Sequence, residues 1–301
     1  MFLVAFPMNC NDRFKRLAAA AVRLAGVLAL GAPLAACSSF DLNDYNPFGA
    51  EKYKMKVEPD VPATSIYDQG LARLAKGDGS GAAKKFGDLT KNYPDSEWEQ
   101  KGLLMQTYSQ YQAGDFDTAE QSAERYVKRY PNSPDAAYAT YLGASSYYSQ
   151  IPDISRDQER AVKALAMFTT VVEKYPNSEY VNDSKFKIQV TRDQIAGKEM
   201  SVGRFYLNRR NYTAAINRFR NVLTNYQTSR HSEEALYRLT EAYLGLGITG
   251  EAETAAAVLG HNFPDGQWYK DAFDLLKGGG LTPNEDQASW ISKIYHSVMP
   301  G

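Results

Sequence analysis

The pentapeptide NYPDS, residues 92–96, recurs along the chain as RYPNS at 129–133 and KYPNS at 174–178. Weaker copies are NYQTS at 225–229 and NFPDG at 262–266. Each copy lies between two runs with helical character. Proline cannot continue a helix and biases the residue before it away from helical angles, and the Asp, Asn or Ser that follows can cap the next helix. Each copy therefore predicts a helix end joined to a helix start.

The spacing of these copies identifies a structural repeat. Pro94, Pro131 and Pro176 are 37 and 45 positions apart, near the period of about 34 residues of tetratricopeptide repeats. In each repeat a small residue is expected to let two helices approach, with an aromatic beside it. Gly-Asp pairs at 77–78 and 114–115 predict tight turns. The pattern resembles five tetratricopeptide repeats, which predicts an all-α fold, an α-solenoid with a concave groove.

Two segments depart from the repeat. Residues 150–160 lengthen the turn of the third repeat, as a spacer or as a docking loop, and residues 179–197 add a helix that could continue to Asn208. After Gly278–Gly280 comes a tail in which residues 289–298 have helical spacing. We expect it to cap the last repeat, with a partner-binding tail as the alternative. Its apolar face comprises Trp290, Ile291, Ile294, Tyr295 and Val298.

The first 36 residues are typical of a bacterial secretion signal. Arg13, Lys15 and Arg16 precede a short apolar run at 24–36, which falls short of the roughly 20 residues needed to span a bilayer. Met8 is an alternative start. The segment Leu34-Ala35-Ala36-Cys37 resembles the lipobox of bacterial lipoproteins.

The lipobox predicts that Cys37 becomes the first residue and carries S-diacylglyceryl and N-palmitoyl groups, which hold a protein firmly on a membrane. The alternative is cleavage after Ala36 with a free thiol. Cys10 leaves with the signal, so the mature chain has no disulfide partner for Cys37. Ser38, in place of Asp, favours the outer membrane. Residues 37–62 are expected to be an extended tether.

The sequence offers no enzyme chemistry. Lys and Arg number 34 against 35 Asp and Glu, a balance that argues against nucleic-acid binding. No P-loop or nucleophile elbow occurs, and the glycines at 77–81 follow no strand, so we interpret them as a repeat turn. His231, His261 and His296 do not have metal-ligand spacing. We expect a binding protein without catalytic residues, metal or cofactor.

The lipobox, the tether and the repeats together resemble the BamD family, lipoprotein subunits of the β-barrel assembly machine of the bacterial outer membrane. The resemblance covers about Val61 to Phe273 and includes YPNSPDAAYATYLGAS, VVEKYPNSEYVNDSKFKI and EMSVGRFYLNRRNYTAAINRFRNVLTNY. It implies a lipid-anchored protein on the periplasmic face of the outer membrane. The tail after Lys277 matches no family motif that we identify.

The resemblance also implies a division of labour. Residues 179–276 would dock onto the last POTRA domain of the barrel subunit BamA, with Arg218 of AAINRFRNVL paired to a carboxylate, and other subunits of the machine would bind as well. Arg218 could instead be an ordinary exposed helix charge. Residues 63–178 would receive unfolded outer-membrane β-barrel proteins. The proposed substrate contacts, for which repeat packing is the alternative, are Tyr93, Tyr67, Trp98, Tyr108 and Tyr111.

Two other functions are compatible with a secreted repeat protein. The first is a periplasmic adaptor like the Tol-Pal coordinator, which usually has a coiled coil before its repeats; no heptad run precedes Ala63. The second is a lipoprotein that recruits a peptidoglycan or protease enzyme, which the sequence does not exclude.

Overall fold

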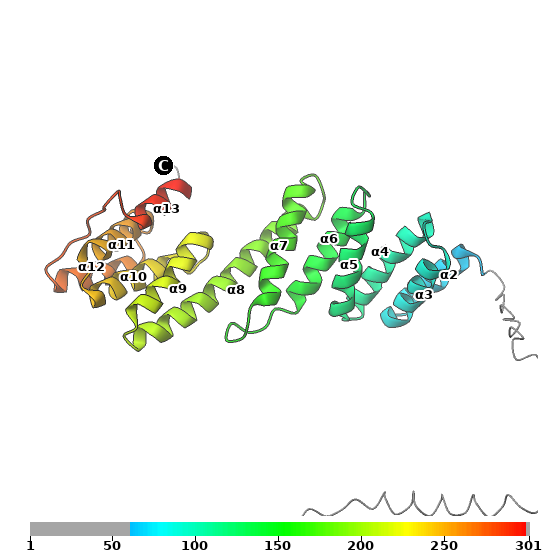
Figure 1. The fold of residues 1–301 in the computed structure, drawn as a ribbon, viewed down its shortest axis with the longest axis horizontal. Coiled ribbons are helices and arrows are strands. Elements are labelled where there is room, and N and C mark those ends of the chain that lie inside the picture. Colours follow the sequence, from blue (N-terminus) through cyan, green and yellow to red (C-terminus); the bar gives the residue numbers. More distant parts are fainter. Residues whose placement is uncertain (1–60, 299–301) are drawn as a thin grey trace, which may run out of the picture. The chain divides into compact units, whose positions relative to one another are not determined.

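The computed structural model describes residues 61–298, which form twelve helices and no strand. The first ten form five hairpin-like pairs, and each helix packs on the next one along the chain (Figure 1). The expected all-α repeat architecture is therefore confirmed. The pairs are α2 (Ala63–Ala75) with α3 (Gly79–Asn92), α4 (Glu97–Gln112) with α5 (Phe116–Arg129), α6 (Ala136–Ser149) with α7 (Glu159–Lys174), α8 (Val181–Asn208) with α9 (Tyr212–Asn225), and α10 (Ser232–Leu246) with α11 (Thr249–Asn262).

The recurring pentapeptide ends the second helix of every pair. Its aromatic residue is the C-cap each time, with a backbone N–H that donates to the carbonyl four residues earlier. These C-caps are Tyr93, Tyr130, Tyr175, Tyr226 and Phe263. The predicted helix ends are thus confirmed.

The prediction that the pentapeptide also caps the next helix is correct only once. The Oγ of Ser96 accepts from the N–H of Glu99 at the start of α4. Ser133, Ser178 and Ser229 instead lie three residues before the first helical residue, and their carbonyls accept from the N–H at that position. An additional turn therefore separates these serines from the helices that follow.

The turns within the pairs use left-handed backbone angles. Gly77, Gly114 and Gly247 have φ values of 77°, 76° and 75°, which glycine adopts without steric penalty. The turn between α8 and α9 has the same geometry, but its left-handed residue is Arg210, with φ of 59°. The predicted Gly-Asp turns are present, and the carboxylate of Asp78 additionally caps α3 through the N–H of Gly81.

Helix α8 joins the third and fourth repeats. It runs without interruption for 28 residues, so the helix added ahead of the fourth repeat does continue to Asn208. The lengthened turn of the third repeat rests on it, because Gln194 Nε2 donates to the carbonyl of Pro152 at 3.0 Å and Lys198 Nζ to that of Ser155 at 2.7 Å. The long turn is held against the middle of α8.

The chain ends in two further helices, α12 (Gln267–Gly278) and α13 (Trp290–Val298). Ile291 and Tyr295 are buried, and the indole of Trp290 donates to the Tyr243 hydroxyl at 3.0 Å. The predicted apolar face thus packs on the last repeats, although the side chain of Val298 lies outside the described part. Whether α13 serves as a cap or also binds a partner stays a prediction.

Within residues 61–298, no helix combines the length and apolarity needed to cross a membrane. The predicted signal, the lipid site at Cys37 and most of the tether lie outside the described residues.

Candidate functional site

Three of the five predicted substrate residues form one aromatic cluster where α2, α3 and α4 meet. The Tyr67 ring lies edge-on to Phe86 at 5.5 Å and to Trp98 at 5.8 Å. The Tyr93 hydroxyl donates to the carbonyl of Val61 at 2.6 Å. The cluster surrounds buried Ala63, Ile66 and Leu89, so its visible contacts join the first repeat to the second. Its binding of substrate stays a prediction.

The other two predicted residues lie elsewhere, in the second half of α4. The ring of Tyr111 packs at 5.6 Å from Phe116 at the start of α5. Tyr108 and Tyr111 both lie near Tyr138 of α6, where burial and, to a lesser extent, the neighbouring phenols raise the pKa of Tyr138. The structure therefore splits the five predicted residues into two groups and links the second group to the next repeat.

Sequence reasoning missed three tyrosines that extend this second group. The Tyr180 ring stacks on Tyr138 at 5.2 Å and on Tyr141 at 4.9 Å, and burial raises the pKa of Tyr180 to about 12. A signal was present, because a tyrosine pair with the same spacing, YATY at 138–141, follows YSQY at 108–111 in the next repeat. We call this partly buried set the tyrosine surface; it comprises Tyr108, Tyr111, Tyr138, Tyr141 and Tyr180.

A partly buried lysine, Lys187, contacts one end of the tyrosine surface. The Tyr141 hydroxyl donates to Asp183 at 2.7 Å and accepts from Lys187 Nζ at 2.8 Å. The Lys187 ammonium also lies 4.7 Å from the centre of the Tyr141 ring, within range of a cation–π interaction. These contacts with Asp183 and Tyr141 keep the pKa of Lys187 above its usual value in spite of burial. Tyr141 is therefore fixed in orientation.

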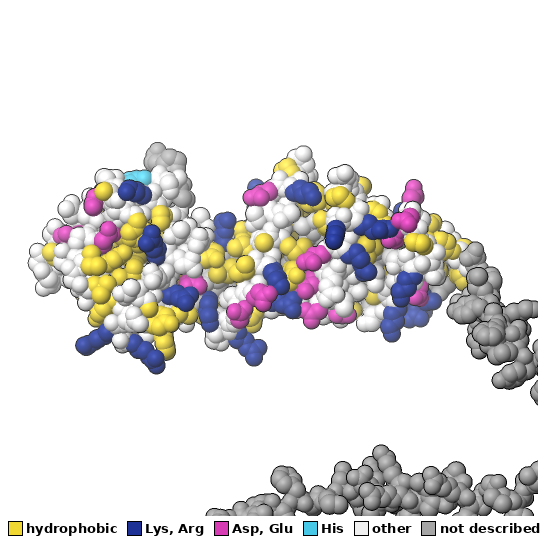
Figure 2. Space-filling model, in the orientation of Figure 1, with side chains coloured by type: hydrophobic (Ala, Val, Ile, Leu, Met, Phe, Trp, Pro, Cys, Tyr) yellow, Lys and Arg dark blue, Asp and Glu magenta, His cyan; other side chains and the backbone are white. Residues whose placement is uncertain are grey.

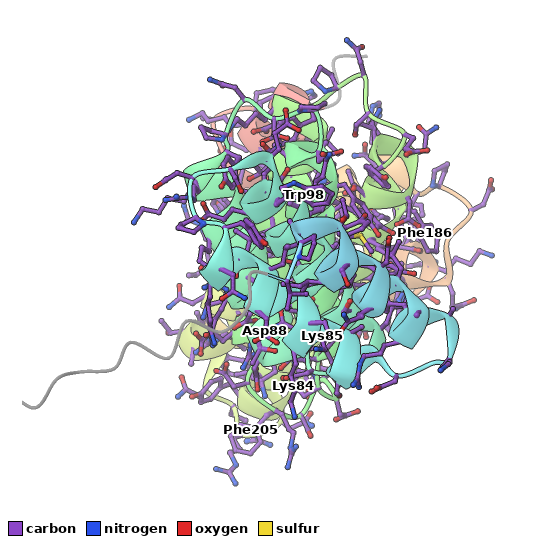
Figure 3. All side chains as sticks on the ribbon, turned by 90° about the vertical axis from the view of Figure 1, so that its right-hand side faces the viewer. Lys84, Lys85, Asp88, Trp98, Phe186 and Phe205 are labelled. Carbon is purple, nitrogen blue, oxygen red and sulfur yellow. The ribbon has the colours of Figure 1, made fainter. Side chains whose placement is uncertain are left out.

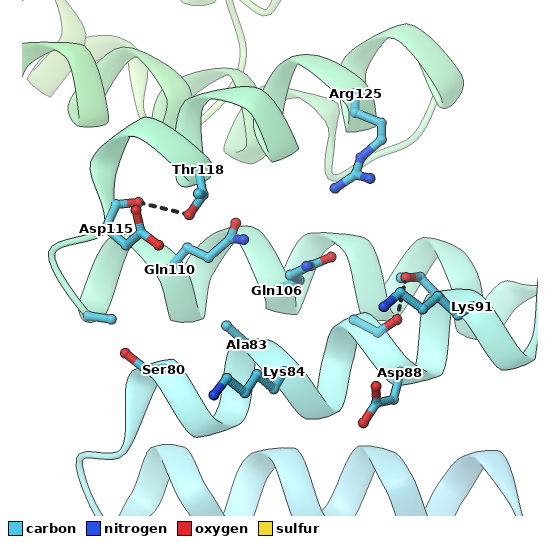
Figure 4. A pocket seen from close by; sticks show the side chains of 13 residues that line it. Ser80, Ala83, Lys84, Asp88, Lys91, Gln106, Gln110, Asp115, Thr118 and Arg125 are labelled. Atoms are coloured by element: carbon cyan, nitrogen blue, oxygen red, sulfur yellow. Dashed lines mark hydrogen bonds between the residues drawn. The ribbon is translucent and has the colours of Figure 1, made fainter. Parts of the chain in front are cut away.

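A pocket lined largely by polar side chains lies over α4, between α3 and α5 (Figure 4). Its volume is about 390 Å³, and it contains none of the predicted residues. The basic side chains of Lys84, Lys91 and Arg125 border it, together with Asp88 and Asp115. This lining suits a polar ligand better than an apolar peptide.

The predicted partner residue Arg218 lies on α9 beside a surface pocket of about 330 Å³. Its side chain is 45% exposed, and one guanidinium nitrogen contacts Glu199 of α8 at 3.2 Å. Glu199 is the one ion-pair partner of Arg218 within residues 61–298. Tyr206 and Asn221 also line the pocket. The other guanidinium nitrogens have no hydrogen-bond partner within residues 61–298 and can meet a carboxylate.

The three histidines lie at helix ends or in an ion pair, and none of them is placed as a metal ligand. His231 is at the N-cap of α10, His261 is in the last turn of α11, and His296 pairs with Glu285 at 3.0 Å. In the described part of the chain, no three His, Cys, Asp or Glu side chains are grouped as a metal site would require.

These features define a class of protein, an all-α protein built from tandem helical hairpins. The family model described as an outer membrane lipoprotein (YfiO) matches residues 59–259. The outer membrane protein assembly factor BamD of Caulobacter vibrioides is 41% identical over 87% of this chain and 83% of the relative. That of Rickettsia prowazekii is 42% identical over 72% of this chain and 86% of the relative.

More distant proteins also match. BamD of Xylella fastidiosa strain Temecula1 is 31% identical over 72% of this chain and 78% of the relative. A thermophilic TPR protein of known structure from Thermus thermophilus covers 70% of this chain and 98% of its own, with 18% identity and a TM-score of 0.32. That structural likeness is too slight to bear on the fold.

The chain belongs to the BamD family of outer-membrane lipoproteins. It is a subunit of the machinery that assembles outer-membrane β-barrels and is not an enzyme. The expected function and outer-membrane location are thereby confirmed, in preference to an adaptor of the Tol-Pal type or a recruiter of peptidoglycan enzymes. The family model begins at residue 59, so lipidation at Cys37 stays a prediction.

Proposed function

We propose that this chain links the barrel subunit of the machinery, BamA, to unfolded barrel proteins, and that the two bind at opposite halves of the repeat array. The observation that carries the proposal is the exposure of the Arg218 side chain and its single ion-pair contact. Its guanidinium is nearly half exposed at the rim of a pocket and engages Glu199 through one nitrogen. A planar fork with free donors matches a carboxylate of the last POTRA domain.

The amino-terminal half would receive the substrate. Unfolded barrel strands carry apolar and aromatic side chains, and the tyrosine surface presents aromatic faces and phenol groups across α4, α6 and the start of α8. Aromatic rings with polar tips suit partly wet binding surfaces. The cluster of Tyr67, Tyr93 and Trp98 lies nearer the tether and is the second candidate for this contact.

Charge reversal tests the docking half. Arg218→Glu should weaken capture of detergent-purified BamA from the same bacterium by up to a few kcal/mol, because the new carboxylate repels the partner's. Lys128→Glu on α5 is the matched control, since Lys128 is also exposed but belongs to the other half. Equal affinity of both variants and the parent protein, measured by titration, would reject Arg218 as the contact.

A further inference from the structure

The turn between α8 and α9 has an unusual residue for its backbone shape. Three other turns within the helix pairs place glycine at the left-handed position, whereas this one places Arg210 there. A side chain with a Cβ is disfavoured at such angles. Backbone strain of this kind persists where the surroundings enforce it and clusters at functional sites. The side chain of Arg210 is therefore a candidate for a role that glycine could not fill.

An exposed aromatic residue lies one helical turn before Arg210. Phe205 is 49% exposed, and the Arg209 guanidinium lies 4.1 Å from the centre of its ring. Basic side chains extend at the α8–α9 turn in Figure 2. Phe205 projects from the edge of the ribbon in Figure 3. Aromatic residues and arginine are the types that dominate binding energy at protein interfaces. We call Phe205, Arg209 and Arg210 the α8–α9 tip.

The tip continues into the Arg218 pocket. The Phe205 ring lies 5.6 Å from that of Tyr206, and Tyr206 lines the pocket together with Arg218. The two sites therefore form one continuous surface along the lower ends of α8 and α9.

This surface has an excess of positive charge. Within residues 61–298, neither Arg209 nor Arg210 has an acidic partner within ion-pair distance. The nearby Arg204 is neutralised, because one of its nitrogens contacts both carboxylate oxygens of Glu234 at 3.0 and 2.9 Å. Glu199, paired with Arg218, is the one acidic side chain lining the pocket. Charge complementarity thus favours an acidic partner at this surface.

We propose that the α8–α9 tip is a second contact for the partner that docks at Arg218, and that it takes an acidic segment of the periplasmic region of BamA bearing an apolar side chain. The inference rests on the proposed function, because it shares the partner. Phe205 would supply the apolar contact, Arg209 would hold its ring in place, and Arg210 would meet a carboxylate at the rim.

The experiment measures the affinity of the full-length protein for detergent-purified BamA of the same bacterium, at two salt concentrations. Phe205→Ala should weaken binding about tenfold, as expected for an aromatic anchor. Arg210→Gly should weaken it about threefold to tenfold and reduce its salt dependence, because a rim charge acts mainly on association. Arg210→Gly should also leave the thermal midpoint unchanged or higher, since it removes the strained angle. Arg210→Lys keeps the charge and should bind within about twofold of the parent protein.

The outcomes separate this inference from the proposed function. If Arg218→Glu weakens binding while Phe205→Ala and Arg210→Gly do not, the tip is not a contact and docking at Arg218 stands. If no variant changes the affinity, both ideas fail. The alternative occupant of the tip is an anionic membrane surface, which binding to phosphatidylglycerol vesicles would detect. If the tip variants lose vesicle binding but keep BamA binding, the tip contacts the membrane and the inference is overturned.

Discussion

The ring of Phe219 on α9 lies directly over the Cα of Gly203 on α8, in the space that a Cβ at Gly203 would occupy. The same relationship joins Gly70 to Phe86, where an added Cβ would lie 2.6 Å from the ring. Both aromatic residues are fully buried. In each pair the absent side chain lets the two helices approach, and the aromatic ring fills the interface.

Gly203→Ala should therefore destabilise the fourth repeat. The Phe219 ring has no free space to move into, and overpacking a core typically costs about 1–3 kcal/mol. Urea unfolding followed by circular dichroism would measure the loss. Gly250→Ala is the control, because Gly250 lies in α11 with no atom within 4 Å of an added Cβ; that change should stabilise the protein by about 0.5–1 kcal/mol. Similar stabilities for the two variants would contradict the packing argument.

Stability should fall in mild acid because of His231. The imidazole is partly buried beside Gly197 of α8, and an added Cβ on that glycine would lie 3.1 Å from Nε2. Burial, and next the charge of Arg230, lower the pKa of His231 from 6.5. Among the other charged groups nearby, Asp193 and Glu234 act against this shift and Arg204 adds to it.

The loss of stability in acid arises because the unfolded chain takes up a proton at His231 more readily than the folded protein does. Below pH about 6.5 the unfolded chain protonates at this histidine while the folded protein does not, so the free energy of unfolding decreases as the pH falls. The decrease ends below the folded pKa, where both states carry the proton. His231→Gln should flatten the pH profile in the range just below pH about 6.5. An unchanged slope in thermal unfolding of the variant would show that other groups are responsible.

Cys37→Ser should abolish lipidation. The lipobox interpretation gives the thiol of Cys37 the role of accepting the diacylglyceryl group, and a hydroxyl does not replace it in that step. The variant is expected to lose palmitate labelling and to leave the membrane fraction, while its helical content stays unchanged. Cys10→Ser is the matched control, because Cys10 lies within the predicted signal. Palmitate still incorporated into the Cys37→Ser protein would refute the assignment.

Local sequence signals were sufficient to predict where the helices end. Proline and glycine fix backbone angles by themselves, so the stops at Tyr93 and Tyr130 and the turns at Gly77 and Gly114 could be predicted without knowing the fold. The helix starts were harder to predict. Ser133 has the same local sequence as a capping serine, but its Oγ bonds with the Tyr126 hydroxyl at 2.9 Å, a contact set by packing.

The proposed binding surfaces depend on contacts between repeats, which the periodicity of the sequence does not specify. Tyr180 stacks on residues about 40 positions earlier, and Arg218 meets Glu199 across two helices. The left-handed angle of Arg210 could have been inferred only by aligning its turn with those of Gly77 and Gly247. Sequence alone thus predicted the architecture and suggested single candidate residues, whereas the grouping of those residues required the structure.

Substitutions can distinguish the two candidate substrate sites, which are the tyrosine surface and the cluster of Tyr67, Tyr93 and Trp98. Tyr108→Leu and Tyr138→Leu keep most of the buried apolar area but remove the aromatic face. Each should weaken binding of a labelled peptide with the sequence of a barrel's last strand by about 0.5–1.5 kcal/mol, the typical value of an aromatic pair. Tyr93→Phe removes only the hydrogen bond to Val61 and should leave peptide affinity unchanged.

Fluorescence anisotropy of the peptide would compare these variants with Trp98→Leu. Trp98 packs on Tyr67 and lies under the Lys101 ammonium at 5.2 Å, so its loss should lower stability more than peptide affinity. If Trp98→Leu or Tyr93→Phe weakens peptide binding more than the α4 and α6 variants do, the substrate contacts are those first expected from the sequence. The role of the tyrosine surface would then be to pack the second repeat on the third. Its rings would bury apolar area between α4, α6 and α8 without contacting substrate.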